Sequence, residues 1–166
     1  GGRWETVQIE SERGPVVQFV GWSFPEATVT ASPLADIDVA PAQGPTVGVL
    51  HCDAGRSESR YAPVDRNDLA RSDADAWLLG HIHAPDEHWE GSQLQLYPGS
   101  LQPLDPGEKG EHGCWEISVE SSGAAEAQMI PLASLRYDRT AIDVAGLDEA
   151  GVESAALETT QVALSN

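Results

Sequence analysis

The amino-acid sequence predicts a β-rich α/β fold, mainly because of a strand–helix–strand unit in the middle of the 166-residue chain. Two continuous apolar runs, Thr46–Leu50 and Ala76–Leu79, are typical of strands that are buried on both faces of a sheet. Between them, Val64–Ser72 has helical spacing, with Asp65 as the expected N-cap and Leu69 facing inward. A helix that connects two buried strands predicts a parallel pair with a crossover.

The first 45 residues are predicted to form a hairpin and a long connection. Glu5–Glu10 alternates and Val16–Trp22 is apolar and β-branched, with a turn at Ser11–Pro15 between them. Pro25–Gly44 contains three prolines and several small residues. We therefore expect this segment to be extended and irregular.

The second half of the chain is predicted to contain four further strands and a helix. The strands are Leu94–Tyr97, Gly113–Val119, Ala125–Leu132 and Leu135–Val144. A Gly/Pro-rich loop, Pro98–Gly110, separates the first two strands. After Gly146, the Ala- and Glu-rich segment Leu147–Leu157 is predicted to be a helix.

The charge and the cysteines limit the possible functions. The net charge is −18, from 9 Lys and Arg residues against 27 Asp and Glu residues. Such a surface repels phosphate backbones, so a nucleic-acid substrate would require positive charge from metal ions or from another chain. No run approaches the roughly 20 apolar residues of a membrane helix, and no signal peptide is visible. Cys52 and Cys114 form no disulfide framework, which favours a reducing compartment, the cytoplasm.

Three histidines stand directly after the two buried strands. His51 ends the first strand, and His81 and His83 follow the second. Strand ends at one edge of a sheet are where open α/β folds place ligand sites, and neutral imidazole binds first-row transition metals. The pattern therefore predicts a partial metal site. His88 and His112 lack this setting, and we expect them to be ordinary histidines.

Three imidazoles are not a complete hydrolytic centre. A two-metal site also needs a bridging carboxylate and further oxygen ligands. Asp53, two residues after His51, is the acidic residue that we expect to lie near the three histidines.

The ordered motifs resemble those of the calcineurin-like metallophosphoesterases. Gly80–His83, preceded by Ala76–Leu79, resembles the last motif of that superfamily, and Val49–His51 resembles the motif before it. Further segments resemble the DNA-repair exonuclease branch, the SbcD-like nuclease subunits. These segments are Trp22–Pro25, Tyr61–Pro63, Asp68–Leu69, Leu96–Gln102 and Gly113–Ile117. The resemblance extends from about Trp22 to Val144.

The resemblance implies two packed mixed sheets flanked by helices and a centre of two divalent metal ions, usually Mn²⁺ in the nucleases. It implies that His51 and His81 bind one ion and that His83 binds the other. It also implies that the Pro98–Gln102 loop borders the substrate cleft, so Ser100 and Gln102 are weaker candidates for substrate binding. A turn that only packs against the sheet is an equally good interpretation of those two residues.

The motifs that come first in the family are not found ahead of these segments. They are an Asp-x-His, a Gly-Asp with the bridging aspartate, and a Gly-Asn-His. Residues 1–132 therefore resemble the C-terminal half of the catalytic domain, and residues 133–166 a linker strand and the start of a cap. The histidine that protonates the leaving group is missing too, so no catalytic residue is assigned and the chain alone is expected to be inactive.

Three functions remain open from the sequence. The first is a nuclease that hydrolyses phosphodiester bonds in DNA, with an ABC-type coiled-coil ATPase as a separate partner subunit. The second is a phosphatase or phosphodiesterase of the same superfamily that acts on small molecules. The third is a non-catalytic scaffold or binding module. Half of a two-sheet domain exposes apolar faces, so we expect the N-terminal half or a homo-oligomer to cover them.

Overall fold

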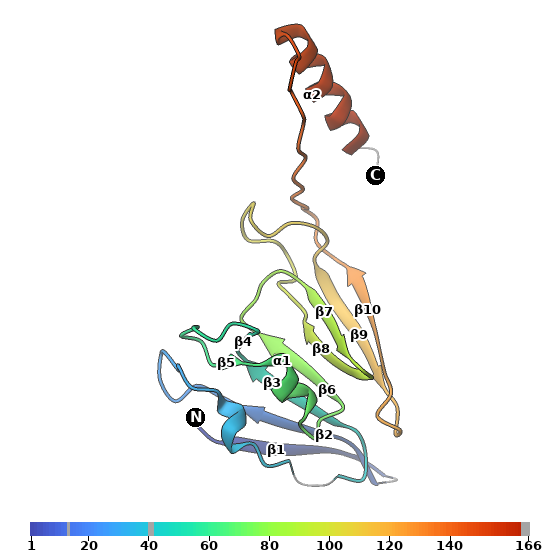
Figure 1. The fold of residues 1–166 in the computed structure, drawn as a ribbon. Helices are drawn as coiled ribbons and strands as arrows, with labels where there is room; N and C mark the ends of the chain where they lie inside the picture. Colours follow the sequence, from blue (N-terminus) through green and yellow to red (C-terminus); the bar gives the residue numbers. More distant parts are fainter. Residues whose placement is uncertain (13, 40–41, 164–166) are drawn as a thin grey trace.

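The computed structural model describes residues 1–12, 14–39 and 42–163, and it confirms the β-rich α/β fold (Figure 1). Six strands form one mixed sheet in the order β1-β2-β3-β6-β8-β7, while β9 pairs with β10 and β4 with β5. The strands are β1 Trp4–Ser11, β2 Gly14–Trp22, β3 Thr46–His51, β4 Asp53–Ala54, β5 Pro63–Val64, β6 Ala76–Gly80, β7 Asp86–Glu90, β8 Gln93–Tyr97, β9 Gly113–Val119 and β10 Ala125–Pro131. The helices are the 3-10 turn η1 Pro33–Asp36, α1 Arg66–Ala70 and α2 Glu149–Ala163.

The predicted strand–helix–strand unit is confirmed. β3 and β6 are parallel neighbours, with His51 opposite Gly80 at their ends. The crossover helix α1 is capped by Asp65, whose carboxylate accepts a hydrogen bond of 2.7 Å from the backbone amide of Asn67. Leu69 of α1 is fully buried, as its position in the helical pattern predicts.

The N-terminal hairpin is confirmed, since β1 and β2 are antiparallel neighbours. The connection predicted over Pro25–Gly44 contains the short turn η1 but no strand in the part that the structure describes. Residue 13 of the predicted hairpin turn and residues 40 and 41 of the connection lie outside the described residues.

The larger core covers one face of the six-stranded sheet and is organised around Trp77. This side chain is fully buried, and its Nε1 donates a hydrogen bond of 3.2 Å to the carbonyl of Leu69. A Cβ at Gly48 would lie 2.3 Å from the Trp77 ring, so the neighbouring strand can carry only glycine there. Trp4 of β1 packs edge-on at 6.0 Å between ring centroids. The core thus holds β3 and β6 in register up to their ends.

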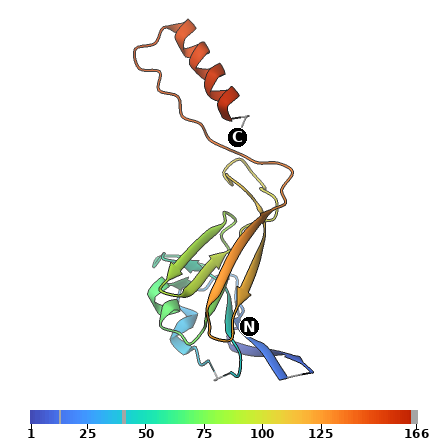
Figure 2. The same ribbon diagram turned by 90° about the vertical axis from the view of Figure 1, so that its right-hand side faces the viewer.

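The opposite face of the sheet is only partly covered. β9 and β10 pack on the β6–β8 side, where Leu94 and Leu96 are fully buried. Val49 of β3 is opposite Leu78 of β6 and so lies on the same face, yet it is 43% exposed. The prediction that Thr46–Leu50 is buried on both faces is therefore wrong at Val49, because the second sheet does not extend over β3. In Figure 2, the blue hairpin of β1 and β2 extends beyond the orange strand β10.

Two strand assignments differ from the prediction. The predicted strand Leu135–Val144 is wrong, because this segment has no partner strand among the described residues beyond a single bridge between Tyr137 and Gly110. Conversely, β7 was not predicted, since its sequence Asp-Glu-His-Trp-Glu is highly polar. It forms because Gly91, with φ of 61°, turns the chain back and pairs β7 with the buried strand β8 at the sheet edge.

The predicted C-terminal helix is confirmed, and it ends later than expected, at Ala163. None of its residues is buried, and Figure 1 shows it apart from the sheets, at the end of an extended segment. The division into residues 1–132 and 133–166 stays a prediction. Within the described ranges, no helix is long and apolar enough to cross a membrane. Both cysteines are free thiols, Cys52 buried and Cys114 partly so.

Candidate metal centre

The ends of β3 and β6 bring two of the three predicted ligands together. His51 is the last residue of β3, and His81 follows β6. Because the two strands are parallel and in register, their carboxyl ends meet, and the two imidazole ring centroids are 5.3 Å apart. A Cβ at Gly80 would lie 2.9 Å from Nδ1 of His51, so glycine leaves the space that the first ring occupies.

His81 has a strained backbone and two close neighbours. Its φ of 99° lies in a region that L side chains rarely adopt and that costs on the order of 1–3 kcal/mol. The ring of Tyr61 lies 4.6 Å from the imidazole, and Oδ2 of Asp53 lies 3.7 Å from Nε2. Such strain persists only where the surroundings hold it, and it clusters at functional sites.

Asp53 lies beside the histidines, as expected. It is 5% exposed and belongs to β4, which pairs with β5. The hydroxyl of Ser59 donates a hydrogen bond to the same Oδ2 that faces His81. β4 therefore presents one buried carboxylate to His81, and the loop that follows β4 restrains this carboxylate through Ser59.

The surroundings of His51 favour its neutral form. Burial lowers the pKa of His51 below 6.5, and the positive charges that His81 and His83 can carry lower it further. Metal ions bind the neutral form of histidine, so this environment suits a ligand better than a general acid.

His83 is held from a different part of the chain. Its Nδ1 lies 2.8 Å from Oε1 of Glu108. The other carboxylate oxygen accepts hydrogen bonds of 2.9 Å from the Leu104 amide and from the Ser100 hydroxyl. The Leu104 amide is the largest cause that lowers the pKa of Glu108, and burial opposes it; His83 and Ser100 lower this pKa further. Glu108 was not predicted, because it is 25 residues from His83, in a loop without periodicity.

The two weaker candidates lie on the same side of the site. The Ser100 amide donates a hydrogen bond of 2.9 Å to the His83 carbonyl, so the loop is tied to the histidine segment. The side chain of Gln102 accepts a bond of 3.1 Å from the Ser134 amide and donates one of 3.3 Å to the Leu135 carbonyl. Their role at a substrate cleft stays a prediction.

The two histidines that were not assigned to the site have other surroundings. His112 is 1% exposed, and its Nδ1 lies 2.9 Å from the Ser100 carbonyl. His88 lies on the edge strand β7, where its Nε2 is 3.6 Å from Glu90.

The donor types at this edge fit a divalent transition metal, but the set is incomplete. Imidazole and carboxylate are ligands that such ions accept, and the structure brings His51, His81 and Asp53 together. Among the described residues, however, no three His, Cys, Asp or Glu side chains are arranged closely enough to hold an ion. The role of His51, His81 and His83 as metal ligands stays a prediction.

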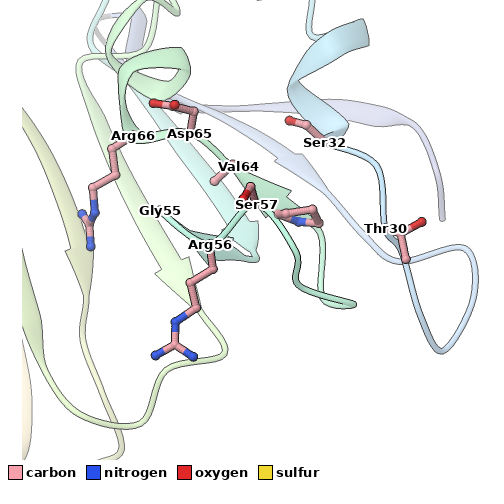
Figure 3. Close-up of a pocket in the computed structure, with 9 residues that line it drawn as sticks. Thr30, Ser32, Gly55, Arg56, Ser57, Val64, Asp65 and Arg66 are labelled. Atoms are coloured by element: carbon pink, nitrogen blue, oxygen red, sulfur yellow. The ribbon is translucent and has the colours of Figure 1, made fainter.

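A cavity of about 500 Å³ opens beside β4 and β5 (Figure 3). It is lined by the hydroxyls of Thr30, Ser32 and Ser57 and by two arginines, Arg56 and Arg66. Ser57 and Arg56 also line a second hollow that reaches Asp53, so the cavity adjoins the hollow beside that carboxylate.

Of the two arginines, Arg66 is better anchored. It forms an ion pair with Asp86, and its guanidinium lies 5.9 Å from the centre of the Tyr97 ring. Its Nη1 is buried and has no hydrogen-bond partner in the described part of the chain. Arg66 therefore keeps one buried N–H group without an acceptor among the described residues.

No family model matches this chain. Over 100 residues the chain is 29% identical to the uncharacterized metallophosphoesterase YhaO of Bacillus subtilis (strain 168). The match covers 59% of this chain and 24% of the relative, so it spans about a quarter of that protein. The similarity supports a place in the metallophosphoesterase superfamily. The narrower SbcD-like branch stays a prediction.

Proposed function

We propose that this chain is part of a metal-dependent phosphoesterase, a DNA-repair exonuclease that hydrolyses phosphodiester bonds. The observation that carries the proposal is the placement of His51 and His81 at the adjoining ends of two parallel strands, with the Asp53 carboxylate beside them. The similarity to a metallophosphoesterase supports the same reaction class.

In this mechanism the chain positions ligands and does not itself transfer protons. His51 is kept neutral by its surroundings, and Asp53 and Tyr61 restrain the ring of His81. Two divalent ions, which we propose to be Mn²⁺, would when bound activate water and neutralise charge on the phosphate. The remaining ligands must come from outside these residues, so the chain alone is expected to hydrolyse nothing.

The arginines favour a substrate with several phosphates. Arg56, Arg60 and Arg66 are three of nine basic residues, and they lie within 11 positions that also include Tyr61 beside His81. Guanidinium groups bind phosphate oxygens in a planar, bidentate geometry. In a chain of net charge −18, these arginines are the groups that a DNA backbone would contact, and Glu58 and Asp65 lie among them in the sequence.

The exposed apolar residues on one face of the sheet also favour a role in binding another polypeptide. Val7 and Val49 are 58% and 43% exposed on the β1–β3 part of the sheet. We propose that the N-terminal half of the catalytic domain, or a second copy of the chain, packs on this face. An ABC-type ATPase subunit would be a further partner of the assembled nuclease.

Titration calorimetry with Mn²⁺ tests the metal centre. We expect weak binding by the chain, lost in His51→Ala and in His81→Ala and unchanged in the matched control His88→Ala. His88 lies on β7, away from the ends of β3 and β6. Equal affinities in all four proteins would refute the ligand assignment.

The substrate is tested in a protein that joins this chain to the remaining ligands. Arg56→Gln and Arg66→Gln should slow hydrolysis of single-stranded DNA and leave a small aryl phosphodiester unaffected. Arg71→Gln is the control, since Arg71 pairs with Asp68 on helix α1. Equal loss on both substrates would contradict a role in binding the DNA backbone. Activity on the small diester alone would favour the small-molecule phosphodiesterase.

A further inference from the structure

A single carboxylate connects His83 to the loop that follows β8. Oε1 of Glu108 lies 2.8 Å from Nδ1 of His83, and the glutamate side chain is 11% exposed. The histidine side chain is 56% exposed, so the carboxylate is the buried partner and the imidazole reaches toward solvent. This contact lies between side chains 25 residues apart.

The hydrogen-bond donors around Glu108 favour its ionised form. An amide from Leu104 and a hydroxyl from Ser100 both donate to its second oxygen, Oε2. These donors stabilise the ionised form, in which a carboxylate can only accept hydrogen bonds. The proton in the short contact with His83 must therefore belong to Nδ1 of the imidazole. In a neutral ring, Nε2 then carries the lone pair.

The surrounding loop keeps this carboxylate in place. The Ser100 amide bonds to the His83 carbonyl at 2.9 Å, and Nδ1 of His112 donates to the Ser100 carbonyl at 2.9 Å. A Cβ at Gly99 would lie 2.7 Å from the same His83 carbonyl, so the two segments touch through backbone atoms. The histidine and its carboxylate partner thus belong to one hydrogen-bonded unit.

We propose that Glu108 is a positioning residue that holds His83 in the Nδ1–H tautomer, with Nε2 presented as the metal-binding nitrogen. The assignment of Nε2 to a metal rests on the proposed function, whereas the tautomer does not. A carboxylate or carbonyl on the far nitrogen is the usual way in which proteins orient a ligating histidine.

Nitrogen NMR of the ¹⁵N-histidine-labelled chain, without metal, tests the tautomer. We expect His83 to be predominantly Nδ1–H in the unaltered protein. In Glu108→Gln, the amide group cannot accept at both of its ends, so the two-sided network is broken and the ring should become a mixture of both tautomers. Glu111→Gln is the matched control, because Glu111 is an exposed side chain in the same loop whose nearest cation is Arg136 at 4.0 Å.

A predominantly Nε2–H ring in the unaltered chain would overturn the proposal, and this measurement does not depend on whether any variant folds. An unchanged Nδ1–H signal in Glu108→Gln would overturn it as well. Ser100→Ala removes one donor to Glu108 and leaves the loop backbone intact. It should therefore produce a smaller shift in the same direction.

Titration with Zn²⁺ separates this proposal from the proposed function. Loss of the orienting carboxylate should weaken binding at His83 about 10–100-fold in Glu108→Gln and not in Glu111→Gln. A tautomer shift in a chain that binds no Zn²⁺ would support the positioning role and count against the metal centre. Unchanged affinity in a variant whose tautomer has shifted would overturn the use of Nε2.

Discussion

The two sides of the histidine site are built in different ways. His51 and His81 are placed by backbone: parallel strands in register, with glycine beside the first ring. His83 is placed by a loop distant along the chain, through the side chain of Glu108 and a backbone hydrogen bond from Ser100. The first arrangement depends on the core beneath the sheet, whereas the second depends on a hydrogen-bonded network at the surface. We therefore expect a single substitution to displace either the His51–His81 pair or His83, and not both.

The largest loss of stability is expected from a substitution in the core beneath β3 and β6, the strands that end at His51 and His81. Trp77→Ala should lower the free energy of unfolding by about 3–5 kcal/mol, because a fully buried indole is lost from β6. Trp89→Ala on the edge strand β7 is the control and should cost much less, since Trp89 is 38% exposed. Urea unfolding measures the free energy of unfolding of both variants. Equal losses would mean that the core around Trp77 does not hold the strands that carry His51 and His81.

The loop side has its own sensitive position at Gly99. Its φ is 75°, and a Cβ would also lie 2.8 Å from Pro85. Gly99→Ala should therefore cost on the order of 1–3 kcal/mol and displace His83. Gly91→Ala is the matched control: its φ is 61°, but a Cβ there would meet nothing within 4 Å. If the two variants unfold at the same urea concentration, the close contact between Gly99 and the His83 segment contributes nothing to stability.

Gly80→Ala should disturb the His51–His81 pair with little loss of stability. The new methyl group would lie 2.9 Å from Nδ1 of His51 and move that ring. We expect Mn²⁺ affinity to fall by about 10-fold, the lower end of the effect of disturbing a ligand's orientation. Gly21→Ala, where the nearest atom would be at an ordinary 3.5 Å, should bind as the parent does. Loss of binding in Gly21→Ala as well would show that the calorimetry reports general disruption.

The smallest effect is a pH dependence of stability. The pKa of His51 is lowered below 6.5 in the folded state, so below that pH the unfolded chain binds more protons at this residue. The free energy of unfolding of the metal-free chain should decrease as the pH falls below 6.5. His51→Gln should flatten this slope, and His88→Gln should not. A steeper slope in His51→Gln would reverse the sign and contradict the assignment.

Local patterns in the sequence were sufficient for much of the fold. Apolar runs and helical spacing predicted β3, α1 and β6, because burial and periodicity act on neighbouring residues. The parallel pairing followed from the crossover, and with it the meeting of His51 and His81 at one edge. Their predicted role as metal ligands still awaits the titrations above.

Only the tertiary structure decided what surrounds these residues. The contact of Glu108 with His83 and the exposure of Val49 both depend on segments that are distant along the chain. Leu135–Val144 has strand-like residues but remains irregular, while the polar segment Asp86–Glu90 forms an edge strand because it has a partner. Propensity determines what a segment can form, and the presence of a neighbour determines whether it forms.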